Sequence, residues 1–124
     1  MNKPRCHGLY AITDAALIPD DRLTTSVEQA ILGGARLIQY RDKSHDAARR
    51  LAQATALNEL CRRHAVPLII NDDVELATQV GAAGVHVGRD DPAFTIARAR
   101  LGQNAIIGVS CYDRLDLARE AAQA

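Results

Sequence analysis

The chain has 124 residues, and its 15 Lys and Arg side chains balance its 15 Asp and Glu side chains, so the formal net charge is zero. This length fits one domain, and the 48% hydrophobic and 24% charged content is that of a globular protein rather than a disordered one. The neutral balance argues against nucleic acid as the main partner. No sequence window approaches the ~18 apolar residues of a membrane-spanning helix.

The N-terminal residues and the cysteines indicate the cellular compartment of the protein. The first seven residues include basic side chains but lead into no long apolar run, so we expect no signal peptide. The three cysteines, Cys6, Cys61 and Cys111, show no C-x-x-C spacing. An odd number of dispersed cysteines without a secretory signal is typical of reduced thiols, so we expect a cytoplasmic protein.

Short β-prone runs alternate with helical patterns along the whole chain. Strands are expected at residues 8–13, 36–41, 66–70, 84–87 and 105–109. Helices are expected at residues 23–32, 46–64, 74–80, 92–101 and from residue 115 to the C-terminus. Gly33 and Gly34 end the first helix because glycine takes the left-handed conformation that a helix C-terminus favours.

Strands that are almost continuously apolar, each followed by a helix, predict an α/β protein with a parallel sheet. Two architectures fit: an open doubly wound sheet, or the first five βα units of a (β/α)₈ TIM-type barrel. No G-x-G-x-x-G follows the first strand, which disfavours the dinucleotide-binding version of the doubly wound sheet. The long second helix is expected to bury one apolar stripe, made of Ala47, Leu51, Ala54, Leu57 and Cys61.

Polar side chains collect at the carboxyl end of each expected strand, where parallel α/β folds place their active sites. They are Asp14; Gln39, Arg41 and Lys43; Asn71, Asp72 and Asp73; Asp90 and Asp91; and Ser110. Alternation along an extended chain puts Gln39, Arg41 and Lys43 on the same side, where they would present two positive charges and an amide to a polyanion. The alternative is that the two cations are solvated and pair with Asp42 or Asp46.

The acidic residues suggest a metal site. Asp72 and Asp91 follow neighbouring strands, and with Asn71 they could hold Mg²⁺, which takes one or two carboxylates together with water and phosphate oxygens. Metal and basic groups together would neutralise a pyrophosphate and help it leave. The alternative is that the aspartates cap helices, which is the role we expect of Asp73.

Three further residues are weaker candidates for chemistry. His86 lies inside an apolar strand, so we expect a buried structural histidine. Ser110 has no evident His–Asp partner, so a hydrolase triad is unsupported. Cys111 has no neighbour that visibly lowers the pKa of its thiol.

Five segments in this order resemble the thiamine phosphate synthase family. They are residues 9–14, residues 39–43, residues 70–73, residues 84–88 with Asp91, and residues 107–110. The resemblance runs through the whole chain and implies a (β/α)₈ barrel. It also implies a transferase of thiamine biosynthesis that joins hydroxymethylpyrimidine pyrophosphate to hydroxyethylthiazole phosphate and releases pyrophosphate. The implied partners are therefore small-molecule substrates, with Mg²⁺ as cofactor.

The resemblance also assigns roles by position. The family residues that contact the pyrophosphate and the pyrimidine correspond to Gln39, Arg41, Lys43 and Asn71. A residue that lines the reaction centre corresponds to Ser110. The Mg²⁺ ligands correspond to Asp72 and Asp91. The expected catalytic residues among these are Arg41, Lys43 and Ser110. Arg89 stands where the family usually has glutamine, so one contact of that loop is left open.

A barrel of this kind typically has roughly 200 or more residues, so we expect the single domain of residues 1–124 to be an incomplete, N-terminal part of one. Such a piece would keep the pyrophosphate–Mg²⁺ half-site, lack the site for the thiazole phosphate, and be inactive alone. One alternative is the related thiazole tautomerase, whose members tend to lose the Asn-Asp-Asp and later aspartate features retained here. Another is a non-catalytic half-barrel fragment, whose unpaired edge strands could associate in a homo-oligomer.

Overall fold

The computed structural model describes residues 7–88, 91–110, 119 and 122, without the side chains of residues 91 and 92. The strands are β1 (Leu9–Ile12), β2 (Ala35–Tyr40), β3 (Leu68–Asn71), β4 (Gly84–Val87) and β5 (Ile106–Val109). The helices are the short 3₁₀ helix η1 (Asp20–Arg22), α1 (Leu23–Leu32), α2 (Ala47–Arg63), α3 (Val74–Val80) and α4 (Asp91–Leu101). The helix expected from residue 115 onward lies almost entirely outside the described residues.

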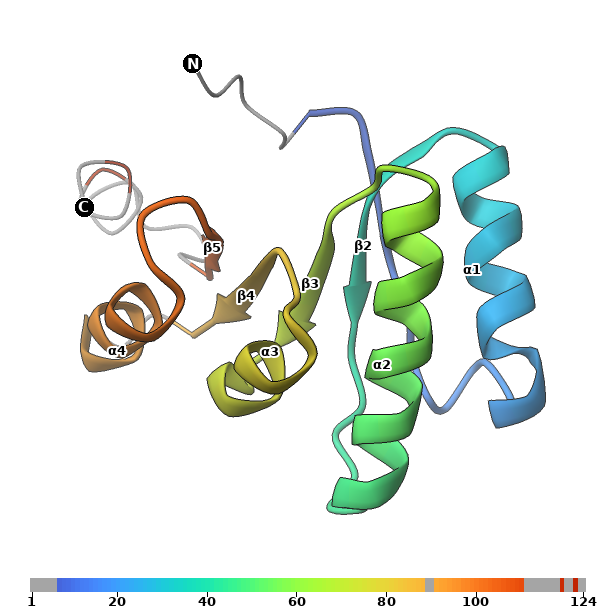
Figure 1. Cartoon of the computed structure of the whole chain (residues 1–124), viewed down its shortest axis with the longest axis horizontal. Helices are drawn as coiled ribbons and strands as arrows, with labels where there is room; N and C mark the ends of the chain where they lie inside the picture. The colour runs from blue at the N-terminus through green and yellow to red at the C-terminus, as the bar shows by residue number, and fades with distance from the viewer. Residues whose placement is uncertain (1–6, 89–90, 111–118, 120–121, 123–124) are drawn as a thin grey trace.

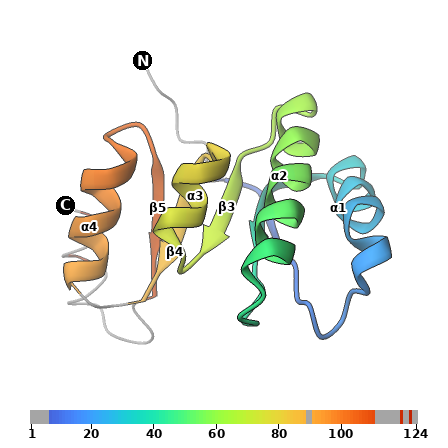
Figure 2. The same ribbon diagram turned by 60° about the horizontal axis from the view of Figure 1, so that its bottom comes forward.

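The strand order decides between the two expected architectures. All five strands are parallel and pair in chain order, β1-β2-β3-β4-β5. Helices α1 to α4 lie on the same side of the sheet (Figures 1 and 2). A doubly wound sheet would instead reverse its strand order at one point and carry helices on both faces. The chain therefore forms an α/β half-barrel of five consecutive βα units, as the barrel alternative predicted.

The core lies between the sheet and the helices. Its buried members include Ile38, Leu68, Ile70 and Val85 from the strands, and Val27, Ala54, Leu57, Cys61, Leu76 and Ala97 from the helices. Each fully buried Val, Leu or Ile side chain stabilises the fold by about 1.5–3 kcal/mol relative to an exposed one. Burial also raises the pKa of the Cys61 thiol to about 11, so this cysteine serves as a small apolar side chain.

Several helix ends follow the sequence signals. Asp73 caps α3, as expected, by accepting a hydrogen bond from the Leu76 amide at 2.9 Å. Gly81 ends the same helix in the left-handed conformation, with a φ of 71°. At the end of α1, only one of the two glycines has the positive φ that was expected of them. Gly33 keeps a φ of −82°, and Gly34 has a φ of 116°.

The apolar stripe predicted for α2 is wrong over its first half. Ala54, Leu57 and Cys61 are buried, whereas Ala47 is exposed and the Leu51 side chain is 41% exposed. The first turns of α2 extend past the carboxyl end of the sheet (Figure 1), so no strand lies beneath them. Polar contacts to the segment after β2 take the place of apolar packing there.

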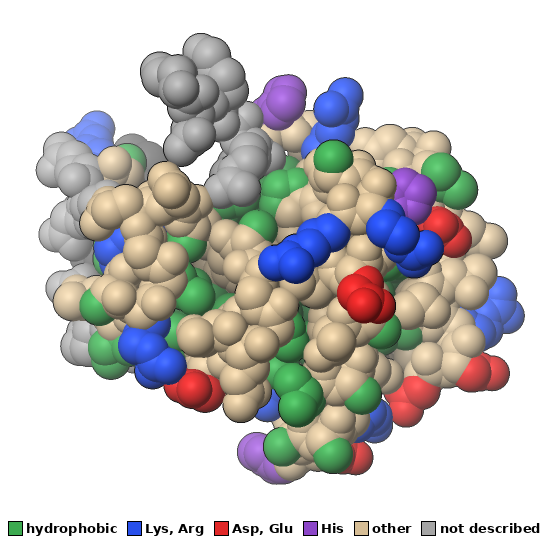
Figure 3. All heavy atoms as spheres, viewed as in Figure 1, with side chains coloured by type: hydrophobic (Ala, Val, Ile, Leu, Met, Phe, Trp, Pro, Cys, Tyr) green, Lys and Arg blue, Asp and Glu red, His purple; other side chains and the backbone are tan. Residues whose placement is uncertain are grey.

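Charged side chains of both signs are interspersed over the helix-covered face, without a patch of one sign (Figure 3). Helices α3 and α4 are joined by an ion pair, in which Arg100 Nη2 lies 2.7 Å from Glu75 Oε1. Among the described residues, none of the helices is long and apolar enough to cross a membrane.

Gly84 lies where β4 and β5 approach closely, because a Cβ added to it would meet the backbone of Ile106, 2.7 Å from the carbonyl carbon. We predict that Gly84→Ala lowers the free energy of unfolding by about 2–3 kcal/mol, since overpacking forces the two strands apart. Urea unfolding followed by circular dichroism measures the change.

Gly88→Ala is the matched control at the end of the same strand. No described atom lies within 4 Å of a Cβ placed at Gly88, so we expect a change below about 0.5 kcal/mol. Equal unfolding midpoints for Gly84→Ala and the unmodified chain would show that β4 and β5 are not in close contact there.

Candidate functional site

The sheet face opposite the helices, called the inner face below, carries one polar side chain from each βα unit. Residues that pair directly in parallel strands point the same way, as does every second residue along a strand. The strand register therefore gathers five polar side chains on the inner face: Tyr10, Gln39, Asn71, His86 and Ser110. Three of them were predicted site residues, and Tyr10 and His86 were not.

Three of these side chains form a hydrogen-bonded chain across β3, β2 and β1. Asn71 Nδ2 donates to Gln39 Oε1 at 3.1 Å, and Gln39 Nε2 donates to the Tyr10 hydroxyl at 3.0 Å. Gln39 is only 4% exposed, so its amide is held with the oxygen toward β3 and the nitrogen toward β1. The alternation that predicted the direction of Gln39 also applies to β1, and would have indicated Tyr10.

His86 and Ser110 form a second polar contact on the inner face, with His86 Nε2 at 2.8 Å from Ser110 Oγ. The histidine is half-buried there, and not the core residue that was expected. Val85 and Val87 are buried against the helices, so alternation alone turns His86 to the other face. Burial lowers the pKa of His86, partly offset by the charge of Asp72, so the imidazole is mostly neutral near pH 7.

Arg41 and Lys43 follow β2 at the carboxyl edge of the sheet. Lys43 Nζ lies 2.8 Å from Asp72 Oδ2, and Arg41 Nη1 lies 4.0 Å from Asp14 Oδ2. The four side chains are 41–59% exposed. Ion pairs with this degree of exposure contribute about 0–1 kcal/mol to the stability of the fold. Arg41 and Lys43 can therefore exchange their carboxylate partners for a bound anion at little cost in free energy.

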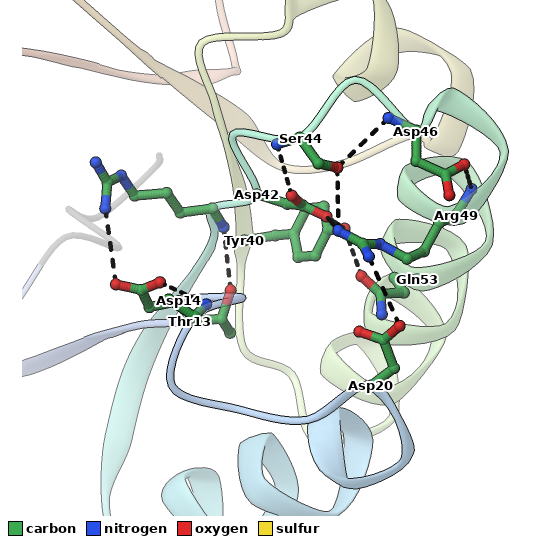
Figure 4. A network of polar contacts seen from close by, with 11 residues as sticks. Thr13, Asp14, Asp20, Tyr40, Asp42, Ser44, Asp46, Arg49 and Gln53 are labelled. Atoms are coloured by element: carbon green, nitrogen blue, oxygen red, sulfur yellow. Dashed lines mark hydrogen bonds and ion pairs between the residues drawn. The ribbon is translucent and has the colours of Figure 1, made fainter.

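A buried network holds the segment that carries these cations (Figure 4). The Asp42 side chain is 1% exposed and its Oδ2 lies 2.7 Å from Arg49 Nη2, while its Oδ1 accepts a hydrogen bond from the Ser44 amide at 2.8 Å. Asp46 caps α2 by accepting from the Arg49 amide at 3.0 Å. The alternative that Asp42 or Asp46 pairs with the two cations is therefore wrong.

A hollow of about 310 Å³ lies beside the cations and is lined by residues 14–16, residues 41–44 and Arg49. A larger hollow of about 500 Å³ lies at the amino ends of the strands, near residues 34–36 and 64–67, and none of the predicted site residues lines it. The two predicted anion-binding residues, Arg41 and Lys43, thus border the smaller hollow, at the end of the sheet where parallel α/β folds place their sites.

Asp72, predicted as a Mg²⁺ ligand, has a φ of 65°, a left-handed backbone that costs a residue with a side chain about 1 kcal/mol or more. Its side chain is 54% exposed. Asp91 begins α4, but its side chain lies outside the described part of the chain, as do Arg89 and Asp90. Within the described part, no three His, Cys, Asp or Glu side chains are arranged to hold a metal. One accessible carboxylate beside Asn71 suits Mg²⁺ shared with phosphate oxygens and water, rather than a closed protein site.

Comparison with known proteins identifies the family of the chain. A family model described as thiamine monophosphate synthase matches residues 9–124. The chain is 58% identical over 118 residues to a thiamine-phosphate synthase of Chromobacterium violaceum, and 59% identical over 114 residues to one of Marinobacter nauticus. These matches cover 95% and 92% of this chain but 56% and 51% of the relatives, so the chain spans about half of their length.

A solved structure shares the fold. It is a thiamine phosphate pyrophosphorylase from Pyrococcus furiosus, with a TM-score of 0.80 and 35% identity, over 93% of this chain and 55% of that one. The family match covers almost the whole chain, and the two curated relatives share more than half of its aligned residues. The chain belongs to the thiamine monophosphate synthase family.

Proposed function

We propose that this chain is the pyrophosphate-binding part of a thiamine phosphate synthase. The enzyme would join hydroxymethylpyrimidine pyrophosphate to hydroxyethylthiazole phosphate and release pyrophosphate. The observation that carries the proposal is the contact of Lys43 with Asp72 at the carboxyl edge of the sheet, beside the exposed Arg41 and the linked amides of Gln39 and Asn71 from the same two segments. The relatives that are named thiamine-phosphate synthases support the same reaction.

Stabilising the leaving group would be the main catalytic task. When the pyrimidine C–O bond breaks, the pyrophosphate leaves with the bonding electrons and gains negative charge. Arg41 can bind it with two parallel hydrogen bonds and Lys43 with a mobile point charge. Preorganised charges of this kind are worth several kcal/mol where charge develops in the transition state.

The inner face would bind the other product of that cleavage, the pyrimidine cation. Gln39 and Asn71 offer oriented amide groups for the polar edge of the ring. A neutral His86 beside Ser110 lines the reaction centre without repelling a cation. The thiazole nitrogen then forms the C–N bond with its own lone pair, so the step needs no general base.

The metal and the rest of the protein complete the proposal. Asp72 and Asp91 would hold Mg²⁺, which when bound supplies positive charge to the phosphate oxygens. The whole protein would be a cytoplasmic (β/α)₈ barrel in which residues 1–124 form the first five units. The following units would hold the thiazole phosphate, since loops after the last barrel strands often bind phosphate.

Lys43→Ala tests the proposed pyrophosphate contact directly. We expect inorganic pyrophosphate to bind this variant of the 124-residue chain about tenfold more weakly in the presence of Mg²⁺, which is about 1.4 kcal/mol. The unfolding free energy changes little, because the ion pair that is lost is exposed. Titration calorimetry measures the affinity.

Arg63→Ala is the control for a general loss of positive charge, since Arg63 is exposed at the far end of α2. Its affinity for pyrophosphate should match that of the unmodified chain. Equal weakening by both substitutions would reduce the effect of Lys43 to net charge and would contradict a specific contact.

Asp72→Asn tests the proposed metal ligand. The assay uses a chimera in which this chain replaces the matching segment of the Chromobacterium violaceum relative, and follows thiamine phosphate formation from both substrates. We expect kcat/KM to fall about 100-fold, roughly 2.7 kcal/mol, because an amide is a weaker Mg²⁺ ligand than a carboxylate. Asparagine tolerates the left-handed backbone of this position, so the fold is retained.

Asp73→Asn provides a matched control on the adjacent residue. Asparagine caps helices as well as aspartate does, so α3 and the activity should remain within about twofold. Unchanged activity of Asp72→Asn over a full Mg²⁺ titration would exclude Asp72 as a ligand. A chimera without any thiamine phosphate formation would contradict the proposed reaction itself.

A further inference from the structure

Arg41 and Lys43 lie in residues 41–46, a segment that belongs to neither β2 nor α2 and has no regular secondary structure. Their side chains are 44% and 59% exposed, so surrounding packing does not fix their directions. The interactions that fix the backbone of this segment therefore decide where the two charges point, and small misplacements of binding groups are costly in enzymes.

Asp42 stands between the two cations in sequence and points into the space between β2 and α2 (Figure 4). Its Oδ1 accepts from the Ser44 amide at 2.8 Å, and its Oδ2 accepts from Arg49 Nη2 at 2.7 Å. The Tyr40 hydroxyl lies 3.3 Å from the same Oδ2 and donates a shorter bond of 2.6 Å to Gln53. One carboxylate thus connects the segment to the strand before it and the helix after it.

The anchor points around Asp42 are themselves fixed. The Arg49 amide donates to Asp46 Oδ1 at 3.0 Å, and the guanidinium also donates to Ser44 Oγ at 3.0 Å. On the other side of the segment, the Arg41 amide donates to the Oγ1 of Thr13, a buried residue, at 3.0 Å. The backbone that carries the two cations is therefore held both before and after Asp42.

The charge of Asp42 is matched within the same network. Burial by itself raises the pKa of Asp42, but the hydrogen bonds from Ser44 and Arg49 and the charge of Arg49 outweigh it and hold the pKa at about 2. The carboxylate is ionised at neutral pH, and Arg49 neutralises it at 2.7 Å. The charges of Arg41 and Lys43 remain available to a ligand, although an aspartate separates them.

We propose that Asp42 is a positioning residue, which holds Arg41 and Lys43 toward the anion while its own charge is taken up by Arg49. The proposal rests on the proposed function of the two cations as pyrophosphate ligands. Asp42 contacts neither substrate nor metal in this role, because its carboxylate is only 1% exposed and its oxygens accept hydrogen bonds from Ser44 and Arg49.

Asp42→Asn removes the anchor with little change in shape. An amide nitrogen replaces one carboxylate oxygen, so either the Ser44 amide or Arg49 loses its acceptor. We expect the affinity of the 124-residue chain for inorganic pyrophosphate with Mg²⁺ to fall at least about tenfold, measured by titration calorimetry. Amide hydrogen exchange followed by NMR should accelerate at Ser44 relative to the core amide of Ile70, which a uniform loss of stability would not produce.

Arg49→Lys is the second variant, in case Asp42→Asn does not fold. Lysine keeps a positive charge near Asp42 but loses the guanidinium that bridges this carboxylate and Ser44 Oγ. We expect a smaller loss of pyrophosphate affinity, about threefold to tenfold, with the same acceleration of exchange at Ser44.

Two controls separate positioning from general effects. Asp20→Asn removes another carboxylate that faces Arg49, at 3.8 Å, but one that is 59% exposed and outside the segment. Asn58→Ala removes the hydrogen bond from Asn58 Nδ2 to the Val80 carbonyl, 2.7 Å long, and so lowers stability without touching the segment. Both should bind pyrophosphate within twofold of the unmodified chain.

The possible outcomes are distinct. Weaker binding and faster Ser44 exchange in Asp42→Asn or Arg49→Lys, with both controls unchanged, support the proposal. Normal affinity in these variants overturns it, and the proposed function still stands if Lys43→Ala binds weakly. If the unmodified chain binds no pyrophosphate, the proposed function fails and the positioning role fails with it.

Discussion

Parallel pairing of the five strands in chain order is the constraint on which the site depends. Because all five strands are parallel, their carboxyl ends lie at one edge of the sheet. Lys43 and Asp72 come together there although they are 29 residues apart, and Asn71 reaches Gln39 across 32 residues. A slip of one residue in the register of β2 would send Gln39 into the core and Ile38 to the inner face, and the polar chain would be lost.

The alternation along β2 also separates two electrostatic environments. Gln39 lies on the inner face and the exposed Arg41 and Lys43 follow it, whereas Tyr40 and Asp42 are buried toward α2. Burying an ion pair costs desolvation that offsets much of its attraction. The lowered pKa of Asp42 shows that the attraction exceeds this cost, so the pair of Asp42 and Arg49 stabilises the fold and also fixes the geometry of the segment after β2. The exposed cations keep loosely held partners that a ligand can replace.

Local patterns are enough to predict α1, α3 and β4 at their observed bounds, because glycines and an aspartate cap mark the ends. Alternation alone places Gln39 with its neighbouring cations. It cannot predict that Lys43 pairs with Asp72, or that His86 meets Ser110, since both contacts depend on how separate strands are aligned. The exposed start of α2 was missed for a similar reason, because the helical pattern does not show where the sheet beneath it ends. The metal role of Asp91 stays a prediction.

Two glycines in the sheet, Gly84 and Gly108, are required for steric reasons alone. A side chain at Gly84 would collide with the backbone of β5, and one at Gly108 would collide with the imidazole of His86 and displace it from Ser110. Neither residue carries a group that takes part in chemistry. Both positions nevertheless exclude a side chain, because any substitution of glycine adds atoms where the sheet has no space for them. A survey of substitutions in this chain will therefore find intolerant positions that supply no functional group and matter only because the fold leaves no room for a side chain.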